Sequence, residues 1–438
     1  MKTLKRFPAV DGSLGWYESM PVQRTHPVKQ VTKNQYFDYI VVGAGFTGLS
    51  TAGRLAELEP DSKIAVIDAL MVGQGTSGRN AGFIIDLPHN LDSNESSVLA
   101  DTHIRELNCF AISRLDRIRQ EQGDNVYWNQ VGKYMAAHEE KHFKNLDSFT
   151  KTLDSINSDY EIVEGADLAS RLGTGYYKKA VYTNGNVLVN PAALVVSVAK
   201  NLPNNVEIFE KSKVTSVDFN LKKLYFDNGV LTANTIILAT NSFTEEFGGC
   251  KNKLAPVFTY ASLTKPLNED ALHKFKKVSP WGVTSAHPAG TTVRFTSDNR
   301  ILIRNSFDVL PDLLSNQKMI DEAKVHHRSS FMARFPSLDA IPFEYSWGGM
   351  LCMTMNHEPV FSESYPGVYA IAAMNGVGIA KGTYLGYYMA EMIKGNKSED
   401  LDFILSNSNP SWVPPDPFKT IGARVRLSIE QRTAKGDK

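Results

Sequence analysis

The stretch Phe37–Asp68, FDYIVVGAGFTGLSTAGRLAELEPDSKIAVID, decides the fold, because its pattern predicts a strand, a tight turn, a helix and a second strand. The apolar run Tyr39–Val42 is short and unbroken, which is typical of a strand buried on both faces in a parallel sheet. The turn after it has the spacing G-x-G-x-x-G. The first glycine allows the tight turn, the second lets the backbone approach a pyrophosphate, and the third lets the helix pack on the strand. These glycines are Gly43, Gly45 and Gly48.

The helix after this turn directs its N-terminus at the expected ligand. Free N–H groups and the positive end of the helix dipole bind an anion there without a basic side chain, and the turn contains none. The next strand, Ile64–Ile67, leads into Asp68, whose carboxylate can accept hydrogen bonds from both hydroxyls of an adenosine ribose. We therefore predict dinucleotide binding, with Phe46 and Thr47 also in contact with the cofactor.

The composition is ordinary for a globular enzyme. Of 438 residues, 42% are hydrophobic and 21% are charged, and 47 basic residues balance 47 acidic ones, so nothing suggests a nucleic-acid partner. The cysteines Cys109, Cys250 and Cys352 are odd in number and lack metal-type spacing, so we expect no disulfide framework, no metal site and a cytoplasmic location. No apolar run of signal-peptide or membrane-span length precedes the first strand, so we expect no integral membrane segment.

The length favours two domains, and the order of the patterns predicts that they interleave. Helical spacing over 96–122 and a buried run at 231–238 extend the first domain, whereas strand-like alternation over 126–137 and 256–347 indicates a second, mostly antiparallel sheet. The predicted class is α/β, with a Rossmann-like dinucleotide-binding domain and an interleaved α+β substrate domain built on a mostly antiparallel sheet. We divide the chain into an N-terminal arm lying over the surface (1–36), the dinucleotide-binding domain (37–122, 186–255 and 348–395), the substrate domain (123–185 and 256–347) and a C-terminal strap (396–438).

A second strand, glycine turn and helix lie near the end, in VYAIAAMNGVGIAKGTYLGYYMAEMIKG at 368–395. The backbone at Gly376 and Gly378, with the helix dipole behind it, suits the pyrimidine edge of a flavin and favours its anionic reduced form. We take residues 43–48 to be the only G-x-G-x-x-G turn, which leaves none for a nicotinamide. The electrons are therefore expected to come from the organic substrate itself.

Five motifs carry a resemblance to a known family. They are DYIVVGAGFTGLSTA (38–52), GQGTSGRNAG (73–82), TIILATN (235–241), WGGMLCMTMNHEPV (347–360) and AAMNGVGIAKGTYLG (372–386). In this order and spacing they resemble the D-amino acid oxidase superfamily of FAD-dependent amine oxidoreductases, and within it the gamma-glutamylputrescine oxidoreductase-like branch. The motifs are specific for superfamily and cofactor and much less specific for substrate.

The resemblance implies FAD, transfer of a hydride from the amine-bearing carbon to flavin N5, and hydrolysis of the resulting imine to a carbonyl compound. Electrons would then pass to oxygen or another acceptor. Some sarcosine oxidases attach flavin through a cysteine in this region, but Cys352 falls about three residues later, so we favour non-covalent FAD. The implied cofactor-binding residues are Gly43, Gly45, Phe46, Thr47, Gly48, Asp68, Ser77, Gly78, Arg79, Asn80, Ala81, Gly82, Val214, Thr240, Asn241, Gly376, Val377, Gly378 and Ile379.

One departure from the family pattern bears on substrate. Many alpha-amino acid oxidases of this superfamily have a carboxylate-binding arginine where this chain has Leu351 and Cys352, so an alpha-carboxylate loses its usual bidentate partner. We expect Arg79, Arg294 or Arg300 to replace it for a carboxylate further along the substrate.

The catalytic and substrate-face candidates are Tyr260, His287, Arg294, Arg300, Trp347 and Asn375. Each has a structural alternative: Tyr260 suits a core position, Arg300 a hairpin after Ser297-Asp298-Asn299, and His287 a loop before proline. The predicted function is oxidation of the C–N bond of a primary or secondary amine, either a polyamine or an amino-acid derivative. Two alternatives stay open: a dehydrogenase that feeds a membrane or protein acceptor, and a non-catalytic flavoprotein subunit. The amine, the acceptor and the oligomeric state are not determined by the sequence.

Overall fold

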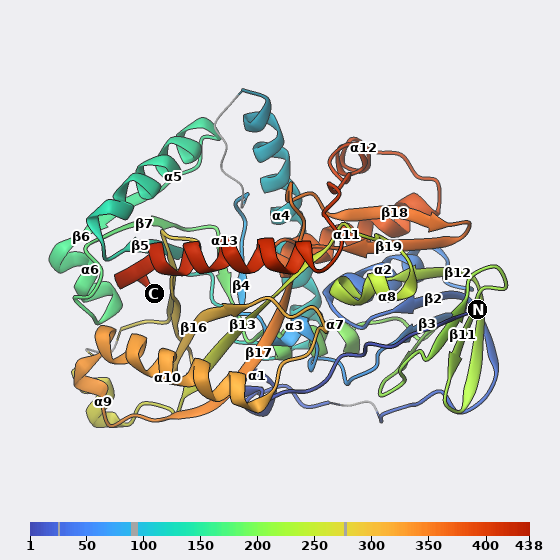
Figure 1. Ribbon diagram of the computed structural model, residues 1–438, viewed down its shortest axis with the longest axis horizontal. Coiled ribbons are helices and arrows are strands. Elements are labelled where there is room, and N and C mark those ends of the chain that lie inside the picture. The colour runs from blue at the N-terminus through green and yellow to red at the C-terminus, as the bar shows by residue number, and fades with distance from the viewer. Residues whose placement is uncertain (25–26, 89–94, 276–277) are drawn as a thin grey trace.

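The computed structural model describes residues 1–24, 27–88, 95–275 and 278–438, and two large sheets dominate it (Figure 1). The first sheet contains the organising stretch, with β2 next to β3 in parallel register. Its order is β1-β10-β11-β12-β2-β3-β9, and β19 pairs with both β12 and β18. Its strands are β1 (Lys2–Thr3), β2 (Gln35–Val42), β3 (Ile64–Ile67), β9 (Val206–Phe209), β10 (Ser216–Asp218), β11 (Lys223–Phe226), β12 (Gly229–Leu238), β18 (Val360–Tyr365) and β19 (Val368–Ala372).

Strand β12 lets one sheet hold both parallel and antiparallel parts. Its first residues pair with β11 in antiparallel register, and its last three, Ile236 to Leu238, pair with β19 in parallel register. Along most of its length it also pairs with β2, in parallel. The ends of β2, β12 and β19 therefore lie side by side at one edge, where open α/β sheets bind ligands.

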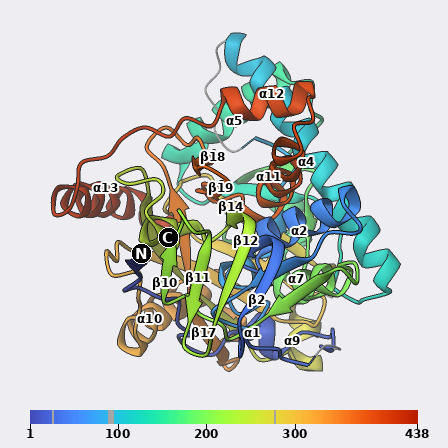
Figure 2. The same ribbon diagram turned by 90° about the vertical axis from the view of Figure 1, so that its right-hand side faces the viewer.

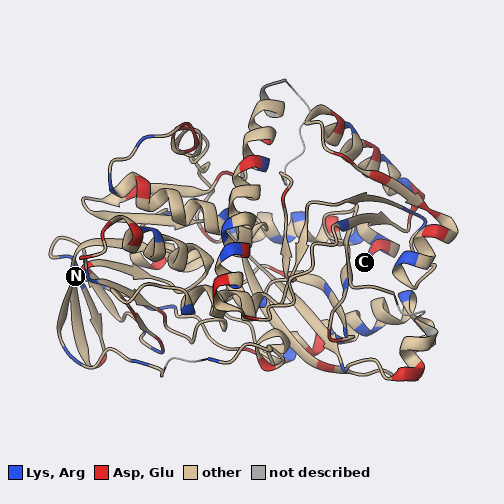
Figure 3. Cartoon of the chain, turned by 180° about the vertical axis from the view of Figure 1, so that it is seen from behind, with Lys and Arg blue, Asp and Glu red and all other residues tan. Residues whose placement is uncertain are grey.

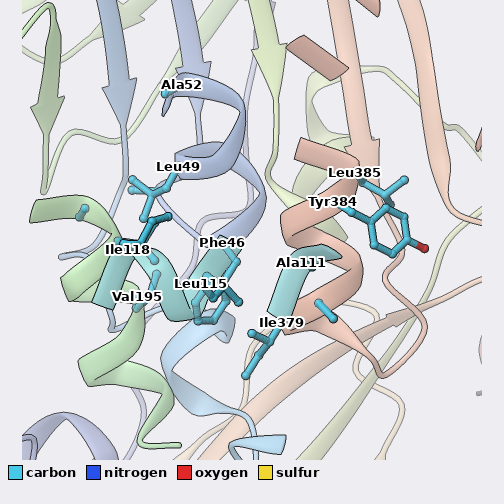
Figure 4. Packing of buried hydrophobic residues seen from close by; sticks show 14 of the residues in the cluster. Phe46, Leu49, Ala52, Ala111, Leu115, Ile118, Val195, Ile379, Tyr384 and Leu385 are labelled. Carbon is cyan, nitrogen blue, oxygen red and sulfur yellow. The ribbon is translucent and has the colours of Figure 1, made fainter. Parts of the chain in front are cut away.

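Helices cover one face of this sheet (Figure 4). Phe46 and Leu49 of α2 pack with Leu115 of α4 and Leu385 of α11 in one continuous buried cluster. On the other face, side chains of β10, β11, α8 and the N-terminal arm join Ile40 and Ile236, both fully buried, in a second apolar cluster. The helices of this part are α2 (Phe46–Leu58), α4 (Glu95–Gln122), α7 (Pro191–Lys200), α8 (Thr244–Phe247), α11 (Gly378–Ile393) and α12 (Glu399–Ser406).

The second sheet has the order β17-β13-β16-β15-β14-β5-β7-β6 and is antiparallel except between β14 and β5. Helices α6 and α10 pack on one face of it. Its strands are β5 (Lys133–Ala137), β6 (Glu161–Glu164), β7 (Lys179–Thr183), β13 (Ala255–Thr264), β14 (Trp281–Ser285), β15 (Thr292–Phe295), β16 (Ile301–Asp308) and β17 (Phe343–Met353). Its helices are α5 (Phe143–Ser155), α6 (Gly165–Leu172), α9 (Glu269–Lys274) and α10 (Gln317–Arg334).

The structure confirms the predicted class: an α/β chain whose Rossmann-like layer is interleaved with an antiparallel sheet. The domain limits remain a prediction. The limit placed between Trp347 and Gly348 falls inside strand β17. Connecting elements are α1 (Gly15–Glu18), α3 (Thr76–Arg79) and the small β4–β8 pair (Phe83–Ile84 with Val187–Leu188). Short 3-10 turns occur at Glu140–His142, Asn241–Phe243, Pro336–Leu338 and Lys435–Asp437.

Two predictions about the connecting segments were wrong. The alternation predicted from 126 belongs to a strand only from Lys133 onward, because Tyr127 has a φ of 52° and Asn129 makes only an isolated bridge to Leu188. The N-terminal arm does more than lie over the surface, since Leu14 and Trp16 are buried. The arm is therefore part of the packing between the two sheets.

The C-terminal strap ends in α13 (Phe418–Ala434), which stands away from the body of the molecule in Figure 2. Beyond α13, Asp437 is 1% exposed and accepts a hydrogen bond from the His138 N–H at 2.6 Å. Basic and acidic residues are interspersed over the side seen in Figure 3. None of the described helices is long and apolar enough to cross a membrane.

Candidate functional site

The turn after β2 has no room for side chains. Gly43 has a φ of 111°, and a Cβ on Gly48 would stand 1.8 Å from the Gly43 carbonyl oxygen. A Cβ on Gly45 would stand 2.6 Å from the Ser77 Oγ. The three glycines are therefore required by the close approach of backbone to backbone and of one loop to another.

Residues 73–78, GQGTSG, repeat the same glycine spacing, which corrects the view that the chain has only one such turn. A Cβ on Gly78 would stand 1.9 Å from the Gly73 carbonyl oxygen, as in the first turn. The Ser77 hydroxyl accepts a hydrogen bond from the Phe46 N–H at 3.1 Å. The second turn therefore faces the first across one cavity, so it does not provide a separate nicotinamide site.

Asp68 lies at the end of β3, as the sequence predicts. Its carboxylate accepts hydrogen bonds from the N–H groups of Ala44 and Leu70, both at 2.8 Å. Burial raises the pKa of Asp68 to about 6 despite these donors. Its position beside the glycine turn suits a ribose, whose hydroxyls would supply further hydrogen bonds to the charged form.

A long cavity, partly open to solvent, begins beside Asp68 and follows both glycine turns to the end of β19. It joins 13 of the predicted residues, from four separate parts of the chain. They are Gly43, Gly45, Phe46, Thr47, Asp68, Ser77, Asn80, Val214, Thr240, Asn241, Asn375, Gly376 and Gly378.

Two long helices begin at this cavity. The N-cap residues, Gly45 of α2 and Val377 of α11, make no side-chain capping hydrogen bond, and at α2 the Ser77 hydroxyl accepts from the Phe46 N–H. Gly45 and Gly378 line the cavity, and a Cβ on Gly378 would meet nothing within 4 Å. Two helix N-termini at the wall, a carboxylate placed for a ribose, and open space beside Gly378 fit an FAD molecule in this cavity.

The other predicted cofactor residues do not line the cavity. They are Gly48, Gly78, Arg79, Ala81, Gly82, Val377 and Ile379. Several of them shape the loops behind it. The Arg79 Nε donates to the Gln74 carbonyl and its Nη1 to the Gly348 carbonyl, both at 2.7 Å, and burial lowers its pKa to about 10. Arg79 therefore joins the second glycine turn to β17.

Two asparagines hold the far end of the cavity. The Asn241 Oδ1 accepts from the Ala373 N–H at 3.0 Å, which ties the ends of β12 and β19 together. The Asn375 Oδ1 accepts from the Thr354 N–H at 2.9 Å, and its Nδ2 donates to the His357 carbonyl at 2.7 Å. Asn375, with a φ of 54°, is the one catalytic candidate that lines the cavity.

The structure gives Tyr260 and Trp347 packing roles. Tyr260 is 1% exposed, and its hydroxyl donates to Asp308 at 2.8 Å. Trp347 is fully buried, donates to the Arg79 carbonyl at 3.0 Å and packs edge-on against Trp16. Neither side chain lines the cavity.

His287 is also away from the cavity. Its Nε2 lies 3.1 Å from the Thr433 hydroxyl of α13, and its Nδ1 accepts from the Ala289 N–H at 3.1 Å. Burial and the neighbouring His142 lower its pKa. The contacts of His287 thus belong to the docking of the C-terminal helix.

The remaining two arginine candidates are engaged by the chain itself. Arg294 is 2% exposed and donates to three backbone carbonyls, and burial lowers its pKa to about 9. These carbonyls belong to Ala81, Gly82 and Val189. Arg300 is ion-paired with Asp298 at 3.0 Å and with Glu344, which matches the hairpin alternative.

Sequence reasoning missed several cavity residues. Arg6 and Phe7 come from the N-terminal arm, and Met350, Leu351 and Met374 form an apolar stretch of the wall. No local pattern marks the arm as part of the site, because its position depends on pairing between β1 and the distant β10. The WGGMLCMT motif includes Met350 and Leu351, so the motif could have indicated these two residues as part of the site.

Cys352 also lines the cavity and is 2% exposed. Burial raises the pKa of its thiol to about 12, so the thiol is protonated near neutral pH. A neutral thiol is a poor nucleophile, which fits an FAD held by shape and hydrogen bonds.

This fold and cavity define a dinucleotide-binding flavoprotein. The family model for FAD-dependent oxidoreductases, DAO, matches residues 38–392, and the chain belongs to that family. It is an FAD-dependent oxidoreductase, and FAD is its cofactor.

The matches to related sequences and to solved structures cover most of the chain. The sequence is 25% identical to a probable oxidoreductase OrdL of Haemophilus influenzae, over 84% of this chain and 85% of that one. It is 23% identical to the gamma-glutamylputrescine oxidoreductase of Escherichia coli, over 87% and 89%. The fold is similar to that of glycine oxidase from Bacillus cereus, with a TM-score of 0.66, 18% identity and coverage of 84% and 97%. It is also similar to L-amino acid deaminase from Proteus myxofaciens, with a TM-score of 0.68, 16% identity and coverage of 91% and 97%.

Proposed function

We propose that this chain oxidises the C–N bond of a primary or secondary amine, namely a polyamine or an amino-acid derivative. The observation that carries this proposal is the chemistry of the cavity wall. Among the described residues that line it, Arg6 is the only basic one, and its Nε is ion-paired with Glu246 at 2.5 Å. No free cation there can hold an alpha-carboxylate, whereas Met350, Leu351 and Met374 offer an apolar surface.

An apolar surface helps amine oxidation in a direct way. Hydride loss requires an unprotonated amine, and low polarity disfavours the ammonium form, so burial lowers the substrate's pKa. FAD, when bound, would supply the acceptor for a hydride from the amine-bearing carbon, and the resulting imine would hydrolyse in water to a carbonyl compound. The chain's part is to position the amine, exclude water and favour the neutral form, so no strong side-chain base is required.

Anaerobic mixing of the purified protein with a panel of amines tests the proposal. We expect the flavin absorbance to bleach with an amine and the matching aldehyde or ketone to appear in equal amount. Bleaching by a hydroxy acid alone, with no response to any amine, would contradict the proposal. It would leave the FAD assignment unaffected.

A second candidate function keeps the same chemistry but passes electrons to a membrane-bound acceptor. Helix α13 favours it, because its larger apolar side chains face outward while Thr420 and Ala434 face inward. These outward side chains are Phe418 (70% exposed), Ile421 (57%), Val425 (55%) and Ile429 (57%). Arginines at 424, 426 and 432 accompany this stripe, a combination suited to an anionic lipid surface.

Co-sedimentation with anionic vesicles separates the two candidates. If the second holds, the protein binds these vesicles, Ile421→Ser with Val425→Ser abolishes binding, and oxygen supports turnover poorly compared with an artificial quinone. Rapid oxygen consumption without vesicle binding would contradict the second candidate and support amine oxidation with oxygen as the electron acceptor. A cytoplasmic location remains a prediction for either candidate.

A further inference from the structure

The N-terminal arm supplies one wall of the FAD cavity. Leu4, Arg6, Phe7 and Pro8 line the cavity, and the Leu4 N–H donates to the Thr215 carbonyl at 2.9 Å. From there the arm runs away from β11 to α1, near the middle of the molecule (Figure 1). Residues 4–8 therefore lie along the cavity, and we call them the N-terminal flap.

The two ends of the flap are held differently. Before it, β1 pairs with β10 through Lys2 and Thr3, and both are exposed. After it, Gly12 bridges to Trp347, and a Cβ on Gly12 would stand 2.4 Å from the Ser346 carbonyl oxygen. A two-residue edge strand separates more easily than such a close backbone contact, so the flap can open from its N-terminal end.

Arg6 holds the middle of the flap in place. Its Nε is ion-paired with Glu246 of α8 at 2.5 Å, and its Nη1 donates to the Pro311 carbonyl at 2.6 Å. The Lys5 N–H also donates to Glu246, at 3.3 Å. Helix α8 packs with the first sheet, whereas Pro311 follows β16 of the second. Arg6 therefore fastens the flap to both layers of the molecule.

These contacts hold the flap without fixing it permanently. The Arg6 side chain is 43% exposed and that of Glu246 is 12% exposed, so water and salt screen their attraction. Within the flap, Leu4 is the buried residue, and it packs in one cluster with Val214 and Phe247. Opening would break the ion pair and uncover one apolar side chain, which is within reach of a local opening of the native state.

The other walls of the cavity belong to packed layers. Gly43 and Gly45 are fixed by close contacts of the glycine turns, and Asn241 ties β12 to β19. These walls move aside only if the first sheet loses its packing. The flap can leave α8 with little loss of buried surface, so it is the suitable entrance for a ligand as long as FAD.

We propose that the N-terminal flap is a gate for FAD, which swings away from α8 when the cofactor enters or leaves and is latched by Arg6 and Glu246. This inference concerns the loading and retention of FAD and goes beyond the proposed amine oxidation. A gate limits entry and exit alike, so unlatching it speeds both and changes the affinity less. A flap that only adds contacts to bound FAD would affect exit alone.

Exchange of bound FAD for radiolabelled FAD tests the gate in the holoenzyme. The protein is mixed with an excess of labelled FAD, and the label that stays on the protein after desalting is followed with time. Arg6→Ala should raise the rate of FAD release about 3- to 30-fold. It should raise the rate at which FAD-depleted protein binds FAD by a similar factor, so that Kd changes less than about threefold. Arg6→Lys should give intermediate rates.

Two further measurements isolate the latch. Glu246→Ala should reproduce Arg6→Ala, and the double variant should release FAD more slowly than the two single effects multiplied together, because the side chains form one pair. About 0.5 M sodium chloride should speed release from the wild type more than from Arg6→Ala, since salt screens an exposed ion pair. The salt test requires no change to the wild-type sequence.

Lys29→Ala is the matched control. Lys29 belongs to the same arm and is ion-paired with Glu207 at 3.4 Å, but it does not line the cavity. The control should change neither rate. Unchanged release from Arg6→Ala, or an equal acceleration in Lys29→Ala, would overturn the gate. Faster release with an unchanged rate of FAD binding would overturn it too, and would leave the flap as a wall that merely contacts the cofactor.

Discussion

The Ser77 hydroxyl accepts a hydrogen bond from the Phe46 N–H, and this 3.1 Å contact joins the two glycine turns that face each other across the cofactor cavity. Each turn is built in the same way, with its last glycine pressed against the carbonyl of its first. These turns would hold the pyrophosphate of a bound dinucleotide through their backbone. The spacing between the turns therefore depends on residues that have no side chain.

Gly45→Val should prevent retention of FAD. A Cβ at this position would stand 2.6 Å from the Ser77 Oγ, and overpacking of this kind costs about 1–3 kcal/mol even before the cofactor is displaced. We expect the flavin content of the purified protein to fall at least about tenfold. Gly422→Ala is the control, because a Cβ there meets nothing within 4 Å. Full flavin content in Gly45→Val would contradict the role given to the first turn.

Asp68 should make the FAD-free protein less stable as the pH rises. Its pKa is raised from 3.8 to about 6, so the folded state holds a proton that the unfolded state has lost between these values. The contribution of Asp68 to stability is then greatest below about pH 4 and is lost as the pH rises through 6, by at most about 3 kcal/mol. Urea unfolding at pH 4 and pH 7 should therefore show that Asp68→Asn gains stability relative to the wild type as the pH rises.

The same substitution should weaken FAD binding, because an amide lacks the charge that the ribose hydroxyls favour. At pH 7, Asp68→Asn should therefore raise the stability of the FAD-free protein and lower its affinity for FAD. Equal pH dependence in both proteins would show that Asp68 is not the group responsible.

FAD should leave the protein on acid precipitation. The Cys352 thiol lines the cavity, but burial raises its pKa to about 12, so almost none of it is thiolate at pH 7. The supernatant should contain all of the flavin, and Cys352→Ser should carry as much FAD as the wild type. Flavin that stays with the precipitated wild type and is released from Cys352→Ser would demonstrate a covalent bond.

The sequence predicted those parts of the site that depend on local pattern. The turn at Gly43, the acid at Asp68 and the helix after Gly376 follow from short-range rules for strands, glycines and helix ends, and the cavity joins all three. The catalytic candidates, apart from Asn375, do not meet at the cavity. A strand pattern predicts which side chains share a face of the strand, but it does not predict which strand lies beside it in the sheet. Arg294 illustrates this, because only the folded arrangement of the two sheets shows that its buried guanidinium donates to the carbonyls of Ala81, Gly82 and Val189.

Leu351→Arg should change which amine the enzyme prefers. Leu351 lines the cavity where many related alpha-amino acid oxidases have an arginine, and loss of one partner from a buried arginine–carboxylate pair costs about 2–5 kcal/mol. Glycine and simple D-amino acids should therefore be poorer substrates than the best amine by a factor of about 30 to several thousand.

Steady-state kinetics on a diamine or N-substituted amine beside the corresponding alpha-amino acid checks this. Leu351→Arg should raise kcat/KM for the amino acid and lower it for the amine, because the new cation attracts a carboxylate and disfavours a second positive charge. Leu351→Met keeps the apolar wall and is expected to retain the wild-type preference. Should glycine or a D-amino acid turn over as fast as any amine in the wild type, the apolar wall at Leu351 does not set specificity, and the carboxylate must bind elsewhere.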